Sequence, residues 1–357
     1  MHRMIDEGPV KGRGASVQVH NRFHAQERGI FELEGVDMTD EGPIATAYIP
    51  TYPRSILNRV VGPDLPFEWT LNPYQGCEHG CSYCYARPTH EYWGYSAGLD
   101  FERVVLVKQR APELLADALR APSWKGEPIM IAGATDPYQP IERQETITRR
   151  LLQVMLDHGQ PVGVITKNAL VLRDLDLLGA LAQQGLASVA ISLTTLDEGL
   201  RRALEPRTSS GLKRLKAIER LSSAGVPVHV MVAPIIPALN ESEVPSLLKA
   251  ASEAGARSAG YTVLRTNGAV EPVFRTLLHT HYPDRAAKVI AQTSALHGGR
   301  MSDSRTGIRM KGEGAYAATI SRLFDVMRRR YFGDARMPLF DRTRFKVPPT
   351  GQLDLFR

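Results

Sequence analysis

Three cysteines, Cys77, Cys81 and Cys84, are the residues of this chain best suited to unusual chemistry. They are the only cysteines in 357 residues, and they stand at CxxxCxxC spacing in the glycine-containing segment LNPYQGCEHGCSYCYARP. Such a loop lets all three sulfur atoms turn inward, and thiolates are soft ligands that suit zinc and iron–sulfur centres. An odd number of cysteines at short separation suits neither a disulfide framework nor an oxidising compartment. The segment therefore predicts a metal site.

The kind of metal centre depends on the number of ligands. A structural zinc ion needs four protein ligands, so His79 or His90 would have to join the three cysteines. The spacing differs from the paired CxxC of a zinc knuckle, and no second pair exists. We expect His79 to be a polar loop residue or a group near the metal centre. Four irons held by three thiolates would leave one iron open, and an open coordination position distinguishes a catalytic site from a closed structural one.

The elements that must position these cysteines can be predicted from short apolar segments that alternate with longer amphipathic ones. Each apolar segment has about 5 to 7 residues, as expected for strands buried in a parallel sheet. The predicted strands cover residues 103–108, 128–133, 161–167, 187–193, 227–234 and 258–265. The predicted helices cover residues 145–159, 172–185, 210–225 and 242–256, and most of them end at a glycine.

This alternation predicts parallel β/α units, which either close into a full or partial barrel or open into a doubly wound sheet. Periodicity alone does not decide between the two. In both arrangements the chemistry gathers at the carboxyl ends of the strands. The segments to inspect are therefore those that follow the predicted strands, namely TDPYQP, TKN, SLTT and APIIP.

The chain divides into four parts by composition. Residues 1–69 are turn-rich and predict an irregular N-terminal extension, 70–270 the α/β core, 271–345 a helical region and 346–357 a flexible tail. Residues 300–357 hold 13 Lys and Arg against 6 Asp and Glu, while the rest of the chain holds 31 against 32. A localised basic surface attracts polyanions such as nucleic acid, although solubility alone would also explain it.

The first residues, MHRMIDEGPVKGRG, carry charges and glycines where a signal peptide would need an apolar stretch. No window of the sequence approaches the roughly 18 uncharged apolar residues of a membrane span. We therefore expect a cytoplasmic protein with no membrane partner.

The cysteine spacing, with the aromatic Tyr83 directly before the third cysteine, resembles the signature of the radical S-adenosylmethionine (SAM) superfamily. The resemblance implies a partial parallel (β/α)6 barrel with an irregular N-terminal extension and a helical basic C-terminal region. It also implies one 4Fe-4S cluster on Cys77, Cys81 and Cys84, with SAM bound at the open iron. Reductive cleavage of SAM would then give a 5′-deoxyadenosyl radical, which requires an electron donor such as flavodoxin or ferredoxin.

Within that superfamily, TDPYQP, ITKN, SLTT, LEPRTSS and VAPIIP resemble segments of spore photoproduct lyase and of bacterial proteins described as DNA repair photolyase-like. The resemblance implies that Thr135 and Asp136 border the SAM amino group, that Lys167 reaches the carboxylate, and that Ser192 meets the ribose or the carboxylate. The alternative is that these are loop residues that cap helices or satisfy the backbone.

Two charged residues of LEPRTSS, Glu205 and Arg207, are expected near the mouth of the barrel. They could form a structural ion pair, or they could clamp the cofactor or the substrate. The sequence does not rank these two roles.

The chain departs from spore photoproduct lyase at Ala134, where that enzyme carries the cysteine that returns a hydrogen atom to the product radical. No fourth cysteine exists, so the same hydrogen-return route is not expected here. A tyrosine could replace the thiol as hydrogen donor, and Tyr85, Tyr138 and Tyr261 are the candidates.

Two further segments suggest macromolecular partners. Tyr92, Trp93 and Tyr95 lie close together after the cysteines, where they could stack on nucleobases or simply pack over a loop. The apolar pentapeptide Gln352 to Phe356, QLDLF, resembles the peptide with which bacterial repair proteins bind the DNA sliding clamp, although such a tail could also pack on its own domain.

The sequence thus predicts a radical SAM enzyme that acts on nucleic acid or on something associated with it. A second reading keeps the radical chemistry and assigns a peptide or a small molecule as substrate. A third is a non-catalytic, metal-stapled adaptor that binds nucleic acid or the clamp.

Overall fold

The computed structural model describes residues 10–24, 45–60, 62, 64–65 and 67–348, together with the backbone of residues 4–6. The predicted tail peptide, Gln352 to Phe356, lies outside these residues, so its proposed clamp contact stays a prediction. No helix of the described ranges is long and apolar enough to cross a membrane.

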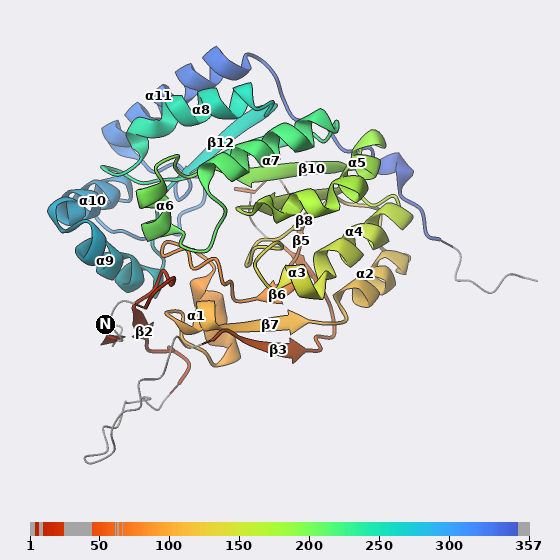
Figure 1. The fold of residues 1–357 in the computed structure, drawn as a ribbon, viewed down its shortest axis with the longest axis horizontal. Helices are drawn as coiled ribbons and strands as arrows, with labels where there is room; N and C mark the ends of the chain where they lie inside the picture. The colour runs from red at the N-terminus through yellow and green to blue at the C-terminus, as the bar shows by residue number, and fades with distance from the viewer. Residues whose placement is uncertain are drawn as a thin grey trace, which may run out of the picture.

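A seven-stranded sheet forms the centre of the molecule, in the order β12-β11-β10-β9-β8-β5-β4. The six strands from β5 to β12 run parallel, and β4 pairs with β5 in the antiparallel direction at the edge. The strands are β4 (Leu57–Arg59), β5 (Trp69–Leu71), β8 (Ile129–Ile131), β9 (Val162–Thr166), β10 (Ala187–Ser192), β11 (Val228–Ile235) and β12 (Ser258–Val263). This curved parallel sheet confirms the expected partial (β/α)6 barrel (Figure 1).

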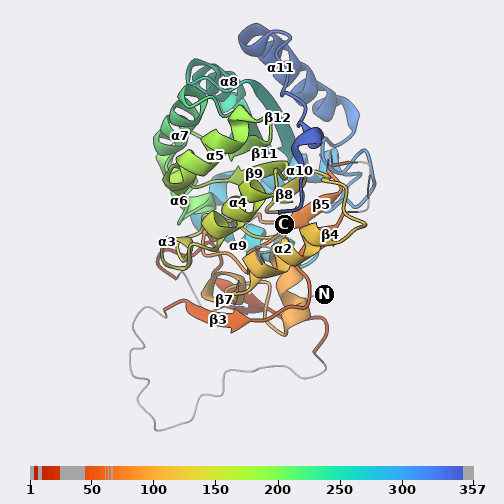
Figure 2. The same ribbon diagram turned by 90° about the vertical axis from the view of Figure 1, so that its right-hand side faces the viewer.

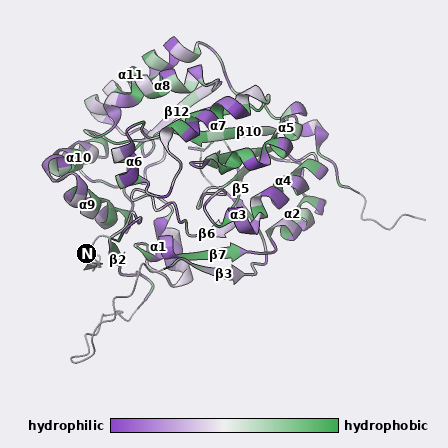
Figure 3. Cartoon of the chain, viewed as in Figure 1, coloured by the Kyte–Doolittle hydropathy of each residue, from purple (hydrophilic) through white to green (hydrophobic). Residues whose placement is uncertain are grey.

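The four helices predicted between the strands are confirmed, and they cover the outside of the sheet (Figure 2). Their apolar stripes pack on the strands, whereas their outer faces are hydrophilic (Figure 3). The α-helices are α1 (Asp100–Arg103), α2 (Ala111–Arg120), α3 (Glu142–Glu145), α4 (Ile147–Asp157), α5 (Leu175–Gln183), α6 (Glu198–Leu204), α7 (Gly211–Ser223), α8 (Val244–Glu253), α9 (Val270–His281), α10 (Pro283–Leu296) and α11 (Gly314–Phe332). The 3-10 helices are η1 (Arg87–Trp93), η2 (Ala169–Asp174), η3 (Glu241–Glu243) and η4 (Arg342–Arg344).

The strand predicted at residues 103–108 exists as β7 (Val104–Lys108). The prediction that it belongs to the main parallel sheet is wrong. It pairs with β3 (Ala47–Thr51) and β6 (Tyr74–Gln75) in a separate three-stranded sheet. The parallel part of the main sheet begins instead with β5, which has only three residues and so shows no periodicity. An apolar run indicates burial, but it does not specify the partner strand. Nearer the N-terminus, β1 (Met4–Asp6) pairs with β2 (Val17–Val19) in the antiparallel direction.

Alternation along β11 separates the two faces of the main sheet. Val228, Val230 and Val232 are buried in the core shared with the outer helices, while His229 and Met231 between them are partly exposed. Because successive side chains of a strand point to opposite faces, these two residues face the inside of the barrel. The inner face is therefore the one that remains accessible to a ligand.

The C-terminal region packs against the far edge of the barrel, and α11 lies along α8 (Figures 1 and 2). After α11 the chain turns back to the amino ends of the parallel strands. The Asp341 N–H donates to the Gly185 carbonyl over 3.0 Å, and the Lys346 N–H donates to the His158 carbonyl over 2.8 Å. Gly185 and His158 precede β10 and β9, respectively. This part of the basic region thus lies at the end of the barrel opposite the carboxyl ends of the strands.

A fully buried ion pair joins α1 to η1. The Arg87 guanidinium donates to the Glu102 carboxylate, and both side chains are inaccessible to solvent. Glu102 also accepts the backbone N–H groups of Gly14 and Ala15, each over 2.9 Å. Arg87 in turn donates to the Cys81 carbonyl over 3.0 Å. The pair therefore ties the N-terminal segment to the cysteine-containing loop.

Replacement of this carboxylate should be costly. Glu102→Gln keeps the shape of the side chain but leaves the Arg87 charge buried and unpaired, so we expect a loss of about 3 to 5 kcal/mol in the free energy of unfolding. Urea unfolding of the metal-free protein measures it. Glu113→Gln is the matched control, since Glu113 is 54% exposed and pairs with Arg150 only at 4.0 Å, and its effect should stay within about 0.5 kcal/mol. Equal losses in both variants would contradict the assignment.

Candidate cofactor site

The three cysteines lie in the loop between β6 and η1, at the carboxyl end of the barrel. Cys77 and Cys81 are buried, Cys84 is partly exposed, and all three are free thiols. The Cys77 N–H donates to the Phe101 carbonyl over 2.8 Å, and the Cys84 N–H donates to the Cys81 carbonyl over 3.2 Å. We call residues 76–84 the cysteine loop.

Close backbone packing explains one of the glycines in the cysteine loop. Gly80 has φ of +66°, in the left-handed region that favours glycine. It lies directly against Gly14 of the N-terminal segment, where a Cβ added to Gly14 would stand 1.6 Å from the Gly80 carbonyl oxygen. The loop and the N-terminal segment thus approach each other as bare backbone.

The three thiols lie in two adjoining apolar clusters. A zinc ion requires all of its ligands at about 2.0 to 2.3 Å from one point. In the described part of the chain, no group of three or more His, Cys, Asp or Glu side chains is placed to hold one metal ion. Cys77 and Cys84 line one apolar wall with Phe101 and Ala134, and Cys81 lies in a neighbouring apolar cluster against which Cys84 also packs. A four-iron cluster takes each thiolate on a different iron, so it does not need the three sulfur atoms to converge on one point.

The two histidines considered as a fourth zinc ligand both have other neighbours. The buried His79 places Nδ1 3.3 Å from Asp136 Oδ2 and Nε2 3.1 Å from Asn168 Nδ2. His90 stacks on Tyr95 with ring centroids 5.2 Å apart, and burial lowers the pKa of His90 to about 4. His79 is thus held between Asp136 and Asn168, and both roles expected for it stay predictions.

Thr135 and Asp136 follow β8, as the sequence indicated, but their side chains are fully engaged within the protein. Thr135 Oγ1 donates to the Gly76 carbonyl over 2.7 Å. Asp136 accepts from Thr166 Oγ1 at 2.7 Å and from the Lys167 N–H at 2.8 Å. Burial would raise the pKa of Asp136, but His79 and these donors outweigh it and lower the pKa to about 2. Both residues therefore hold the cysteine loop to the ends of β8 and β9.

Lys167 and Ser192 are brought together and remain available. Thr166 is opposite Ile191 in the pairing of β9 with β10, so the next residues, Lys167 and Ser192, leave neighbouring strands at the same level. Ser192 is also opposite Met231, which faces the inside of the barrel. Among the described residues neither the Lys167 ammonium nor the Ser192 hydroxyl has a hydrogen-bond partner, and Lys167 Nζ lies 5.8 Å from the centre of the Tyr83 ring. These are the groups best placed for a ligand.

A second buried network lies behind Tyr83. Glu205 accepts hydrogen bonds from the Tyr83 hydroxyl and the Arg214 guanidinium, and also from Thr194 Oγ1 at 2.7 Å. Burial would raise the pKa of Glu205, but the charges of Arg214 and Lys167 outweigh it and lower the pKa to about 2. The network places a fixed negative charge beside Lys167.

Glu205 and Arg207 form separate ion pairs, so the structural role left open by the sequence is observed for both. Glu205 pairs with Arg214, and Arg207 pairs with Glu78 of the cysteine loop at 2.6 Å. The Arg207 N–H also donates to the His79 carbonyl over 3.3 Å. The LEPRTSS segment thus braces the cysteine loop from outside.

Of the three candidate hydrogen donors, Tyr85 lies beside Ala134. Its hydroxyl donates to the carbonyl of Gly133, the residue before Ala134, and Ala134 itself packs in the apolar cluster with Cys77 and Cys84. Tyr138 is fully buried, and Tyr261 packs on Phe324 with ring centroids 4.5 Å apart.

The aromatic residues after the cysteines lie largely on the surface. Tyr92 and Trp93 are exposed, with Tyr92 packed against Phe23 at 4.9 Å between ring centroids, while Tyr95 stacks on His90. Stacking on nucleobases stays a prediction for this group.

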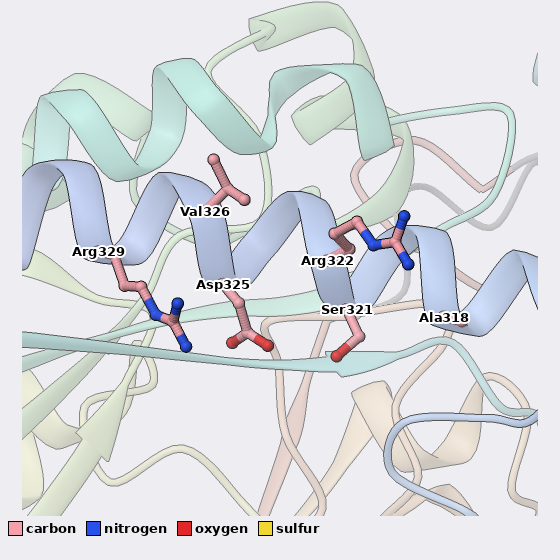
Figure 4. Close-up of a pocket in the computed structure, with 6 residues that line it drawn as sticks. All are labelled: Ala318, Ser321, Arg322, Asp325, Val326 and Arg329. Carbon is pink, nitrogen blue, oxygen red and sulfur yellow. The ribbon is translucent and has the colours of Figure 1, made fainter.

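A shallow depression of about 390 Å³ lies on the outer face of α11 and has no part in this site (Figure 4). All of its lining residues come from that one helix: Ala318, Ser321, Arg322, Asp325, Val326 and Arg329. It holds none of the side chains of the cysteine loop or of the strand ends.

Several residues that build the site were missed in the sequence. Asn72 Oδ1 accepts the N–H groups of Gly133 and Ala134, each over 2.8 Å, and Gln139 Oε1 accepts the Glu78 N–H over 3.0 Å. Asn72 stands next to a proline before the cysteines, and Gln139 lies within TDPYQP, so both were inside the highlighted segments. The sequence does not indicate that Arg87 and Arg214 are buried, because a buried arginine can be recognised only when its acidic partner is known.

Comparison with known proteins agrees with this geometry. The family model of the radical SAM superfamily matches residues 71–251, which include the three cysteines and the strand ends. An uncharacterized protein of Mycobacterium tuberculosis is 37% identical over 238 residues, which cover 66% of this chain and 70% of the relative. An uncharacterized protein of Methanocaldococcus jannaschii is 30% identical over 176 residues, covering 49% of this chain and 63% of the relative.

Among solved structures, spore photoproduct lyase complexed with dinucleoside spore photoproduct superposes with a TM-score of 0.57 and 18% identity over 80% of each chain. At this identity the likeness concerns the fold. Together with the matched family model and the cysteine loop at the carboxyl end of a (β/α)6 barrel, it completes the assignment. This chain belongs to the radical SAM superfamily, whose members use a 4Fe-4S cluster and SAM.

Proposed function

We propose that this chain is a radical SAM enzyme in which Cys77, Cys81 and Cys84 hold one 4Fe-4S cluster, with Lys167 and Ser192 in contact with SAM. The observation that carries the proposal is the row formed by Lys167 and Ser192 on the inner face of the barrel, close to a loop that contains every thiol of the chain. When bound, the cluster and SAM supply reductive cleavage of SAM to a 5′-deoxyadenosyl radical.

The residues of the chain bind and orient the cofactor, and they exclude water from it. Lys167 offers a half-buried ammonium to a carboxylate. Burial would lower the pKa of that ammonium, but the negative charges of Cys81 and Glu205 outweigh it and raise the pKa. Thr135 and Asp136, expected as SAM contacts, are assigned to positioning instead, because their side chains are committed to the cysteine loop and to the end of β9. Ala134 leaves an apolar wall beside Cys77 and Cys84, and the Tyr85 hydroxyl donates to the carbonyl of the preceding residue, Gly133.

The substrate class that we favour is nucleic acid. It is supported by the fold shared with spore photoproduct lyase, by the exposed Tyr92 and Trp93, and by the basic surface of α11. The described basic residues after α11 lie at the amino ends of the strands, so they would anchor a polyanion away from the cysteine loop rather than at it.

The metal assignment can be tested by anaerobic reconstitution. The chain should bind about four irons and cleave SAM after reduction, and Cys77→Ala, Cys81→Ala and Cys84→Ala should each lose most of the iron. Ser82→Ala is the matched control within the same loop, since the Ser82 hydroxyl is buried without a partner in the described structure. One zinc per chain and no SAM cleavage would instead support the metal-stapled adaptor.

The role of Lys167 can be separated from cluster binding. Lys167→Met should retain iron but weaken SAM binding by about 10- to 100-fold. This factor corresponds to the loss of one charge-assisted hydrogen bond, which contributes about 1.5 to 3 kcal/mol. Lys108→Met is the control, because Lys108 is also a half-buried lysine at a strand end, but in the small sheet. Calorimetric titration of the reconstituted proteins with SAM gives the affinities. Unchanged affinity in Lys167→Met would end the assignment.

A DNA shift assay over a range of salt concentrations tests the substrate class. Binding through phosphates should weaken steeply with salt, and the triple variant Arg328→Gln, Arg329→Gln and Arg330→Gln should reduce the slope of log K against log salt by up to about 3. The control carries Lys213→Gln, Lys216→Gln and Arg220→Gln, three exposed cations of α7. An absence of any shift would favour a peptide or a small molecule as substrate.

A further inference from the structure

A basic hollow lies on the outer side of the cysteine loop, between the N-terminal segment, α6 and α9. Its volume is about 600 Å³. The residues that line it include Lys11, Arg13, Gly14, Arg201 and Arg202. It contains none of the side chains that face the inside of the barrel, and it is therefore separate from the proposed SAM pocket. We call it the N-terminal hollow.

The lining of the N-terminal hollow is cationic and includes no carboxylate among the described residues. Two of its arginines are turned into the protein, since Arg13 Nη1 donates to the Glu102 carbonyl and Arg201 Nη1 donates to the Glu205 carbonyl. Lys11 and Arg202 are exposed, and in the described part of the chain Arg202 pairs only with Glu198 of its own helix, at 3.2 Å. These two cations face an approaching partner.

Only a thin wall separates the N-terminal hollow from the cysteine loop. Gly12 and Gly14 line the hollow without side chains, and Gly14 packs directly on Gly80 between Cys77 and Cys81. Arg207 joins the N-terminal segment to the cysteine loop. Its side-chain Nε donates to the Gly12 carbonyl at 3.1 Å, and its backbone N–H donates to the His79 carbonyl. On this side, the backbone of the cysteine loop lies one chain thickness below the surface.

We propose that the N-terminal hollow is the docking surface for a small acidic electron-transfer protein with a flavin or an iron–sulfur centre. This inference rests on the proposed function, which needs one electron delivered to a centre whose thiols are largely buried. The electron passes from the reduced donor to the cluster, so the donor is oxidised by one electron and no bond forms between the proteins.

The chemistry of the hollow favours an acidic protein over nucleic acid. Surfaces that bind single-stranded nucleic acid combine cations with aromatic side chains on which bases stack. Among the described residues, no Phe, Tyr or Trp lines the N-terminal hollow. Complementary charge between proteins, by contrast, raises the rate of association at low ionic strength.

The test compares a protein donor with a small reductant. The reconstituted full chain is reduced either by flavodoxin hydroquinone or by dithionite, and the reduced cluster is followed by electron paramagnetic resonance after rapid freezing. Lys11→Glu combined with Arg202→Glu should lower the second-order rate constant with flavodoxin about tenfold or more at low salt, and the rate with dithionite should be unchanged. The matched control carries Lys216→Glu and Lys249→Glu, two exposed lysines on α7 and α8 that also pair with a glutamate on their own helix.

The possible outcomes separate this inference from the proposed function. If the wild-type chain shows no signal with dithionite, the proposed cluster itself fails. If it is reduced normally and the Lys11 and Arg202 variant keeps the wild-type rate with flavodoxin, the docking surface is wrong. Loss of DNA binding in that variant with an unchanged flavodoxin rate would assign the hollow to nucleic acid instead. A selective loss of the flavodoxin rate supports the proposal.

Discussion

Two carboxylates without access to water, Glu102 and Glu205, hold the cysteine loop in place, and the site depends on them. A buried charge is tolerated only when it is paired and its hydrogen-bonding capacity is filled. Glu102 meets Arg87 and two backbone N–H groups, whereas Glu205 meets Arg214, Tyr83 and Thr194. Such pairs add little to stability compared with an apolar core, but they fix one arrangement of the chain, because every alternative leaves a charge unpaired.

This constraint explains why the loop needs so little regular structure. The segment before the first cysteine ends with β6, and the segment after the third cysteine is a 3-10 helix, so neither places the sulfur atoms directly. Contacts with distant parts of the chain do so instead. Asp136 lies against His79 and Gln139 accepts the Glu78 N–H on one side, and the Arg207 N–H donates to the His79 carbonyl on the other. A loop held from several sides can present thiols to a cluster and still leave the barrel interior open.

The sequence predicted the scaffold better than the supports of the site. Buried parallel strands and amphipathic helices carry their own periodicity, which is why the strands β8 to β12 and the helices between them could be predicted. Pairing partners carry no such signal, so β7 was placed in the wrong sheet. The motif residues Thr135 and Asp136 do follow a strand, as the sequence predicted, but the hydrogen bonds that tie their side chains to Gly76, Thr166 and Lys167 had no sequence signal. Arg87 and Arg214 look like surface residues until their partners are seen.

The contact of Gly14 with Gly80 links the cysteine loop to the N-terminal segment as one cooperative unit. Both chains approach as backbone, and Glu102 accepts N–H groups from one while its partner Arg87 donates to the other. Neither can separate without exposing the buried pair, so local opening of one entails opening of the other. The Gly14 and Ala15 amide hydrogens should consequently exchange with solvent only when the cysteine loop opens. Hydrogen exchange at these two amides therefore reports whether the loop is closed, without any need for a bound cluster or for catalysis.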